Sequence, residues 1–348
     1  MKIFDRMKNR GHEQLIFCLN KPTGLKAIIA IHDTTLGTSV GGTRLMEYDS
    51  EEEAIIDALR LSEITTHQSA SFNSDMGGGA AVLMVGPGQD TDEAYFRAFG
   101  RFVEGLKGLF VTYPAFGTSD RDFRFIRRET GSVVPMEASH EITAVGVLWG
   151  MKACVRELTG SSGLGDVHVA VQGAGKVGQH LIDELMREGA KVTVTDVRYD
   201  QLKIVQDRHP EVAIVRPEEI LDVECTVLSP CAVGRILNDE TIPRLKCRIV
   251  AGSASDVLER PEHADLLDKR GILYAPDFVI GGAELYQTEA ELKDAPRERL
   301  LDEAKRVYDV MAELVTRAKK EGTTPYRVAV AEAARRVGRI RMVRNIMC

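Results

Sequence analysis

The 348-residue chain lacks several features that would assign it to a special class of protein. It has no apolar run that approaches the ~20 residues needed to cross a bilayer. Its first residues, MKIFDRMKNRGHEQ, contain no apolar segment of the kind found in secretory signals. We therefore expect a protein without membrane partners and with a cytoplasmic location.

An excess of basic residues is also missing. Lys plus Arg number 45 and Asp plus Glu number 52, which gives a formal net charge of −7. A general nucleic-acid binder needs a basic face for the phosphate backbone, so this charge balance argues against one. The six cysteines, none of them in a CxxC pair, predict reduced and mostly buried thiols and no zinc site.

The composition that is present describes an ordinary globular protein. Hydrophobic residues make up 44% of the chain and charged residues 28%, so disorder as the main state is excluded. At about 150 residues per domain, the length predicts roughly two domains.

Apolar runs and amphipathic segments alternate along the first half. Strands are predicted at 25–32, 80–85 and 110–112, and helices at 50–62, 91–106, 119–130 and 142–159. From residue 167 the pattern becomes regular, with strands at 167–171, 191–195, 226–228, 248–251 and 272–275 and a helical segment from 298 onward. This alternation predicts an α/β fold with a parallel sheet covered by helices.

A glycine loop marks the start of the regular half. The predicted strand 167–171 leads into Gly173-Ala174-Gly175-Lys176-Val177-Gly178, a helix follows, and the next strand ends in Asp196. A GxGxxG loop in this setting is typical of dinucleotide binding, because its backbone can approach a pyrophosphate at the helix N-terminus. Asp196 would bind ribose hydroxyls and repel a 2′-phosphate, which favours NAD. Arg198 lies two residues after Asp196, beyond Val197, and because of this arginine NADP remains the alternative cofactor.

Longer segments carry a family resemblance over almost the whole chain. They are GLKAIIAIHDTTLGTSVGGTR (24–44), EEEAIIDALRLS (51–62), MGGG (76–79), ITAVGV (142–147), VQGAGKVG (171–178), SPCAVGRILND (229–239), AGSASDVL (251–258) and APDFVI (275–280). The chain resembles the glutamate/leucine/phenylalanine/valine dehydrogenase superfamily, closest to its leucine and phenylalanine dehydrogenases.

This resemblance implies two α/β domains. Residues 1–140, with C-terminal helices at about 325–348, would form a substrate and oligomerisation domain, and 141–324 a Rossmann-type NAD-binding domain. It also implies a homodimer or larger homo-oligomer that acts on an amino-acid-like small molecule. Substrate contacts would fall on Gly41, Gly42 and Gln68. Further cofactor contacts would fall on Thr143, Cys231, Ala232, Gly252, Ser253 and Ala254.

The sequence departs from the family at its catalytic positions. The family uses one lysine to hold the substrate carboxylate, a second lysine to activate water and an aspartate to move protons. Here these positions are Gln68, Ala80 and Ala115. Alanine cannot titrate, and glutamine carries no charge. The resemblance thus implies that ordinary oxidative deamination is improbable.

Other titratable residues could take over the acid–base chemistry. His140 and Glu141 replace a Ser-Pro pair of the family, and His67 and Asp75 flank Gln68 and the glycine run. Histidine suits proton transfer near neutral pH. Each of the four could equally be a solvated loop residue.

Three functions stay open at this point. The first is an NAD-dependent oxidoreductase with altered chemistry, which moves a hydride to or from an imine or another small amino-acid-derived substrate. The second is a catalytically inactive NAD-binding protein that regulates or assembles with an active partner. The third is an ordinary L-amino-acid dehydrogenase with substitute catalytic groups.

Overall fold

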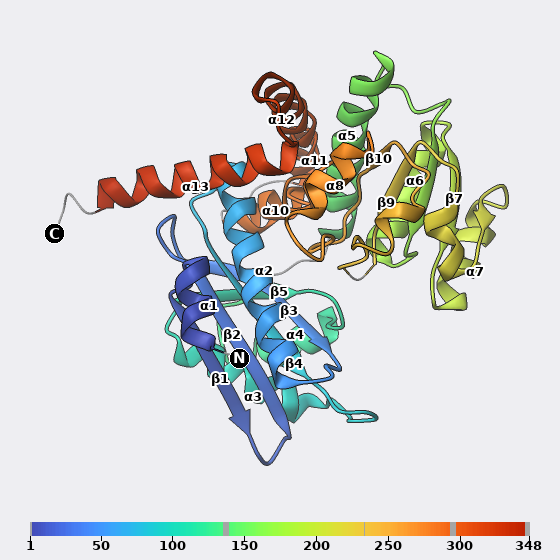
Figure 1. The fold of residues 1–348 in the computed structure, drawn as a ribbon. Helices are drawn as coiled ribbons and strands as arrows, with labels where there is room; N and C mark the ends of the chain where they lie inside the picture. Colours follow the sequence, from blue (N-terminus) through green and yellow to red (C-terminus); the bar gives the residue numbers. More distant parts are fainter. Residues whose placement is uncertain (1, 135–138, 233, 293–296, 345–348) are drawn as a thin grey trace. The chain divides into compact units, whose positions relative to one another are not determined.

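The chain folds into two compact units in this computed structural model, which describes residues 2–134, 139–232, 234–292 and 297–344. Unit 1 comprises Met1–Glu137 and Glu332–Cys348, and unit 2 comprises Ala138–Ala331. Each unit contains one β-sheet (Figure 1). Helix α13 (Pro325–Arg344) begins in unit 2 and ends in unit 1. Within the described ranges, no helix combines the length and apolar character that a membrane span requires.

Unit 1 is built on a five-stranded sheet of order β1-β2-β4-β3-β5. The pairs β1–β2 and β2–β4 are antiparallel, whereas β3 runs parallel to β4 and β5. Its elements are α1 (Ile3–Arg10), β1 (Gln14–Asn20), β2 (Leu25–Asp33), β3 (Ser39–Met46), α2 (Glu51–Ser71), β4 (Gly77–Met84), α3 (Glu93–Gly105), β5 (Phe110–Pro114) and α4 (Asp120–Ile126).

Helices cover both faces of this sheet (Figure 1). On one face, aromatic residues of α3 and α4 such as Phe99 and Phe123 pack against alternate strand residues, among them Ala81. On the other face, α2 packs through Leu59 against the alternate set that includes Val82. Since side chains alternate along a strand, the residues of β4 that lie two positions from Val82 also face α2.

Most of the predicted elements of unit 1 are confirmed, but α1 was not predicted and several other elements differ. Strands β1 and β3 were not predicted, and β4 begins at Gly77 rather than at residue 80. Helix α2 starts after its Ser50 cap, as expected, but continues to Ser71 instead of ending at residue 62. Its last turns are rich in Ser and Thr, whose hydroxyls donate to carbonyls one turn earlier, as Thr65 does to Leu61 at 3.0 Å.

Unit 2 contains a six-stranded sheet of order β11-β10-β9-β6-β7-β8, and all its recorded strand pairs are parallel. The prediction of an α/β fold with a parallel sheet is confirmed. Its elements are α5 (Ser139–Thr159), β6 (His168–Gln172), α6 (Lys176–Arg187), β7 (Lys191–Thr195), α7 (Tyr199–Arg208), β8 (Ala213–Ile214), β9 (Val227–Pro230), β10 (Ile249–Val250), α8 (His263–Lys269), β11 (Leu273–Tyr274), α9 (Asp277–Ile280), α10 (Ala283–Leu292), α11 (Arg297–Ala304) and α12 (Val307–Glu321), with 3₁₀ turns at Pro217–Asp222 and Ile242–Arg244.

The order of the strands positions the candidate site. Strand β6 lies between β9 and β7. The chain passes from β6 through β7 to β8 on one side, and then continues with β9, β10 and β11 on the other side. Ligands of such sheets bind beyond the carboxyl ends of the strands, at the point where the strand order reverses. The glycine loop that follows β6 lies at this point.

Candidate active site

The glycine loop of unit 2 has the geometry that its sequence predicts. Gly173 has a φ of 105°, which favours glycine. A Cβ on Gly178 would lie 2.1 Å from the carbonyl oxygen of Gly173, so only glycine allows this close contact between helix and loop. A Cβ on Gly175 would meet no heavy atom within 4 Å. The N-terminus of α6 therefore opens onto space that a pyrophosphate fits.

Asp196 is fixed beside this loop. One of its carboxylate oxygens accepts the backbone N–H of Ala174 at 2.7 Å, and the other accepts that of Arg198 at 2.8 Å. The loop is held further because Gln179 Nε2 donates to the carbonyl oxygen of Ala174 at 2.8 Å. Since each carboxylate oxygen has a second lone pair, Asp196 can still accept from ribose hydroxyls.

The loops that follow β9 and β10 lie at the same edge of the sheet. A Cβ on Gly173 would come within 3.0 Å of the Ala232 side chain and 2.9 Å of the Cys231 backbone. Gly252 lies against Pro230, because a Cβ there would be 2.1 Å from its carbonyl oxygen. The structure thus brings together Gly173–Gly178, Cys231, Ala232 and the segment 252–254. Cys231 is half-buried, whereas Cys18, Cys154, Cys225 and Cys247 are buried.

Thr143, His140 and Glu141 lie in the first two turns of α5, also within unit 2. Thr143 is buried, and the other two side chains are half-buried. Their roles, like those of all the predicted catalytic residues, stay predictions.

In unit 1 the positions that the resemblance assigns to catalytic groups lie on or beside the face of the sheet that α2 covers. Ala80 lies two residues before Val82 on β4, so it lies on the face that α2 covers. Arg44 on β3 pairs with Asp57 on α2, and Gly42, two residues earlier, lies on the same face. A Cβ on Gly42 would be 2.7 Å from the Ala115 side chain.

Gln68 is buried on α2, the helix that covers this face. A Cβ on Gly41 would lie 1.8 Å from the carbonyl oxygen of Gly79, so β3 and β4 are in close contact where the glycine run ends. Ala80 is itself buried. Small side chains and an uncharged amide thus occupy the positions where the resemblance implies two ammonium groups and a carboxylate.

His67 belongs to a group of three histidines, which we call the histidine trio. The rings of His12 and His32 have centroids 4.6 Å apart, and those of His32 and His67 are 6.4 Å apart. The pKa of His67 is lowered to about 4, chiefly by burial. The charge of Glu63 opposes this shift, and His32 and Arg10 add to it. With this pKa, His67 is neutral at pH 7 and a weak base.

Asp75 lies at the end of the loop between α2 and β4. Its side chain is 92% exposed and forms an ion pair with Arg336 of α13 at 3.2 Å. Arg336 also donates to the carbonyl oxygens of Ser69 and Ser74 at 3.2 and 2.6 Å. These contacts favour a structural role for Asp75 as an anchor for the C-terminal helix.

No group of three or more His, Cys, Asp or Glu residues that could hold a metal ion occurs in the part of the chain that the structure describes. One notable pair was not predicted from the sequence. Arg235 and Asp256 form an ion pair at 3.1 Å between the loops after β9 and β10.

Comparison with known proteins gives full-length relatives. The family described as "Glu/Leu/Phe/Val dehydrogenase, dimerisation domain" matches residues 12–132. Leucine dehydrogenase of Thermoactinomyces intermedius is 42% identical over 99% of this chain and 96% of the relative. Phenylalanine dehydrogenase of Bacillus thermotolerans is 40% identical over 99% of this chain and 92% of the relative.

A solved structure agrees with these relatives. The L-tryptophan dehydrogenase from Nostoc punctiforme superimposes with a TM-score of 0.78 at 37% identity and covers 97% of this chain and 99% of its own. The chain belongs to the Glu/Leu/Phe/Val dehydrogenase family. The predicted resemblance and the two-domain Rossmann-type fold are thereby confirmed.

As a Glu/Leu/Phe/Val dehydrogenase family member, the chain is an amino-acid-dehydrogenase-like oxidoreductase with NAD as its cofactor. The residues of the glycine loop fit that cofactor, because Gly175 leaves space at the helix N-terminus and Asp196 is held ready for ribose. The family assignment does not settle the chemistry, since the resemblance predicts Gln68, Ala80 and Ala115 at the catalytic positions.

Proposed function

We propose that this chain catalyses hydride transfer to or from a preformed imine or another small amino-acid-derived substrate, and does not carry out ordinary oxidative deamination. The observation that carries the proposal is the contrast between the two units. Unit 2 has the loop geometry typical of dinucleotide binding, whereas Ala80 and Ala115 of unit 1 have side chains that cannot titrate.

In this proposal unit 1 is the substrate and oligomerisation part and unit 2 the cofactor part. The backbone N–H groups at the start of α6 would hold the pyrophosphate, and Asp196 would hold the adenine ribose. The bound dinucleotide would supply or accept a hydride. Thr143, Cys231 and Ala232 would line the nicotinamide end.

A preformed imine suits the altered unit 1. Oxidative deamination needs a base to activate the water that attacks the imine, and alanine cannot supply one. Reduction of an imine needs no water. The C=N carbon gains a hydride, the nitrogen gains a proton and the dinucleotide is left oxidised. An iminium already carries that proton, so the demand on His140 or Glu141 as proton donors would be small.

Gln68 would contribute to substrate binding rather than to proton transfer. Its amide can donate to a carboxylate oxygen but lacks the charge of a lysine. A neutral donor forms a weaker hydrogen bond than a charged one, which favours a substrate whose carboxylate is absent, esterified or bound elsewhere.

The competing candidate is an NAD-binding protein without catalysis. It is favoured by the burial of Ala80 and by the lack of room for a side chain at Gly42 beside Ala115, which leave little space at these positions. In this case the partner would be another protein, and cofactor binding would have a structural or regulatory role.

We also propose that a second copy of the chain is the partner of unit 1. Strand β1 is an edge of the sheet, and its Phe17 and Leu19 side chains are 58% and 67% exposed. An exposed apolar edge strand is a ready site for pairing with another chain. The matched family description, a dimerisation domain at residues 12–132, agrees with this location.

The test is incubation of the purified chain with NADH and a panel of cyclic and acyclic imines and of keto acids with ammonia. We expect loss of NADH absorbance with at least one imine, with the amine identified by mass spectrometry. We expect no rapid NAD reduction with leucine, phenylalanine or valine, and such reduction would refute the altered chemistry. NADH binding without turnover of any substrate would favour the non-catalytic candidate.

A further inference from the structure

The loops that follow β9 and β10 carry two residues with an unusual backbone. Arg235 has a φ of 61° and Asp256 a φ of 60°. This left-handed region is costly for residues with a Cβ, and the surrounding structure must hold them there. Such residues cluster at ligand sites, where a fixed backbone geometry is useful. Here they lie opposite one another at the edge of the sheet where the cofactor binds.

The two residues are joined through both backbone and side chain. The N–H of Arg235 donates to the carbonyl oxygen of Asp256 at 2.6 Å, and Arg235 Nε donates to Asp256 Oδ2 at 3.1 Å. The Asp256 side chain is only 5% exposed, against 37% for Arg235. The neighbouring Gly234 has no room for a Cβ, which would lie 2.4 Å from the Asp256 carbonyl oxygen. The pair therefore closes a very tight contact between the loops.

The same loops are also joined at their inner ends. The N–H of Ala254 donates to the carbonyl oxygen of Pro230 at 2.9 Å, directly beyond β9. Between this inner contact and the Arg235–Asp256 pair lie Cys231, Ala232 and Ser253, which are candidate cofactor contacts. Val257, which follows Asp256, donates its N–H to the buried carboxylate of Asp277 on α9 at 2.9 Å. Contacts thus link the segments that follow β9, β10 and β11.

Strand order tells which half of a dinucleotide these loops face. Strands β9 and β10 lie on one side of β6, and β7 with Asp196 lies on the other. A pyrophosphate at the β6 loop leaves the adenine ribose on the Asp196 side, so the second nucleotide extends toward β9 and β10.

We propose that Arg235 and Asp256 are positioning residues, whose ion pair holds the loops after β9 and β10 in the geometry that receives the nicotinamide half of the cofactor. This inference rests on the proposed binding of NAD(H) by unit 2. The strained backbone of both residues would thus help to set the geometry of the cofactor site.

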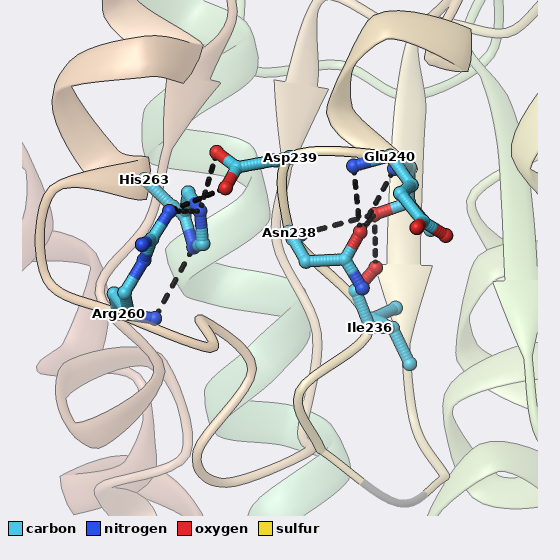
Figure 2. Close-up of polar contacts among 7 residues, drawn as sticks. Ile236, Asn238, Asp239, Glu240, Arg260 and His263 are labelled. Atoms are coloured by element: carbon cyan, nitrogen blue, oxygen red, sulfur yellow. Dashed lines mark hydrogen bonds and ion pairs between the residues drawn. The ribbon is translucent and has the colours of Figure 1, made fainter.

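A second set of contacts joins the same two segments farther along, so the pair can be removed without separating them. Leu237 and Leu258 form an isolated parallel bridge. Beyond it, Asp239 pairs with Arg260, and His263 Nε2 lies 3.2 Å from Asp239 Oδ1 (Figure 2). The turn from residue 236 to 241 is held by its own Asn238, whose Oδ1 accepts the Thr241 N–H at 2.9 Å.

The test uses Arg235→Gly in the full chain. Glycine adopts a φ of 61° without a Cβ penalty, so the variant loses the ion pair and keeps the backbone. Two probes separate the halves of the cofactor site: NADH, followed by its fluorescence, and ADP-ribose, followed by calorimetry. We expect Kd for NADH to rise about tenfold, as for loss of a coupled pair, while Kd for ADP-ribose stays unchanged.

Two further variants complete the experiment. Lys107→Gly is the matched control, because Lys107 also has a positive φ, 52°, but lies in unit 1 and should leave both Kd values unchanged. Asp256→Asn keeps a residue that tolerates the left-handed region and removes the charge, so it should weaken NADH alone.

The outcomes distinguish this inference from the proposed function. If Arg235→Gly lowers the Tm but leaves Kd for NADH unchanged, or weakens both probes equally, the pair has no role in positioning the nicotinamide loops. If the unaltered chain binds neither NADH nor ADP-ribose, the proposed cofactor binding fails, and this inference fails with it.

Discussion

At the scale of single residues, glycines decide where a dinucleotide can bind. Position 173 needs glycine because its φ is positive, and position 178 needs glycine because the helix contacts the loop closely there. Gly175 is different, because neither φ nor neighbouring atoms demand glycine there. Its role follows only from the space in front of α6, where a side chain would compete with a pyrophosphate.

This difference makes Gly175→Asp a specific probe. The carboxylate would occupy the space before the helix N-terminus and repel the pyrophosphate, so we expect NADH binding to be lost in a fluorescence titration. The fold should tolerate the change, since a Cβ meets no atom within 4 Å. Gly165→Asp is a suitable control, because a Cβ there also has open space but lies in the turn before β6. An unaltered titration of Gly175→Asp would show that the loop does not bind the nucleotide.

At the scale of elements, sequence periodicity predicted five of the six strands of the unit 2 sheet, because each is a short apolar run ended by a turn, and missed the two-residue β8. It missed β3, whose Gly41 and Gly42 dilute the strand pattern. That segment is a strand because β4 and β5 lie on either side of it, and Gly41 is needed to avoid the Gly79 carbonyl oxygen. Such requirements come from the neighbouring strands, so the residues of the segment itself do not reveal them.

The candidate site shows the same limit. The glycine loop and Asp196 were predictable because their spacing along the chain sets their geometry. The Arg235–Asp256 pair was not, since a positive φ at a residue other than glycine is imposed by the contacts of the folded chain. The assignment of Ala80 and Ala115 to catalytic positions was predictable only from the family resemblance.

Strand β1 gives a prediction about assembly. If its edge pairs with a second copy, the double variant Phe17→Lys/Leu19→Lys should place charge in the interface and shift the protein to monomer. Light scattering after size-exclusion chromatography would measure this as a fall in molar mass. Ile204→Lys, on α7 of unit 2 and 37% exposed, is the control. An unchanged mass for the double variant would place the oligomer interface elsewhere.

At the scale of the whole molecule, the histidine trio makes stability depend on pH. His12 Nε2 lies 2.8 Å from the Leu59 carbonyl oxygen, so it donates, and its Nδ1 is buried without a hydrogen-bond partner. His32 Nε2 similarly donates to the Arg10 carbonyl oxygen at 2.8 Å, and its Nδ1 lies 2.7 Å from the Thr66 hydroxyl. The fold thus favours the neutral form of the His12 ring.

Burial, with a smaller contribution from His32, lowers the pKa of His12 from 6.5 to about 4, against the opposing charge of Glu63. Arg10 lowers it slightly, and His67 behaves similarly. Between pH 6.5 and 4 the unfolded chain binds more protons, so the free energy of unfolding falls as pH falls through this window. His12 alone should account for about 2 kcal/mol between pH 7 and pH 5.

Urea unfolding at several pH values would measure this dependence. His12→Gln keeps a donor for the Leu59 carbonyl oxygen and does not titrate, so its stability should depend less steeply on pH. Equal slopes for the two proteins would show that His12 is not protonated on unfolding in this range.

The half-buried Cys231 beside the glycine loop also has a chemical consequence. Burial raises the pKa of the Cys18 and Cys247 thiols to about 11, and that of Cys154 and Cys225 to about 12, which keeps them from forming the reactive thiolate. Iodoacetamide should therefore alkylate Cys231 faster than these four, and saturating NADH should slow the reaction, as peptide mass mapping would measure. Equal rates with and without NADH would argue against cofactor contact at this loop. If NADH slows the alkylation as expected, the Cys231 thiol serves as a label that reports occupancy of the nucleotide site without any knowledge of the substrate.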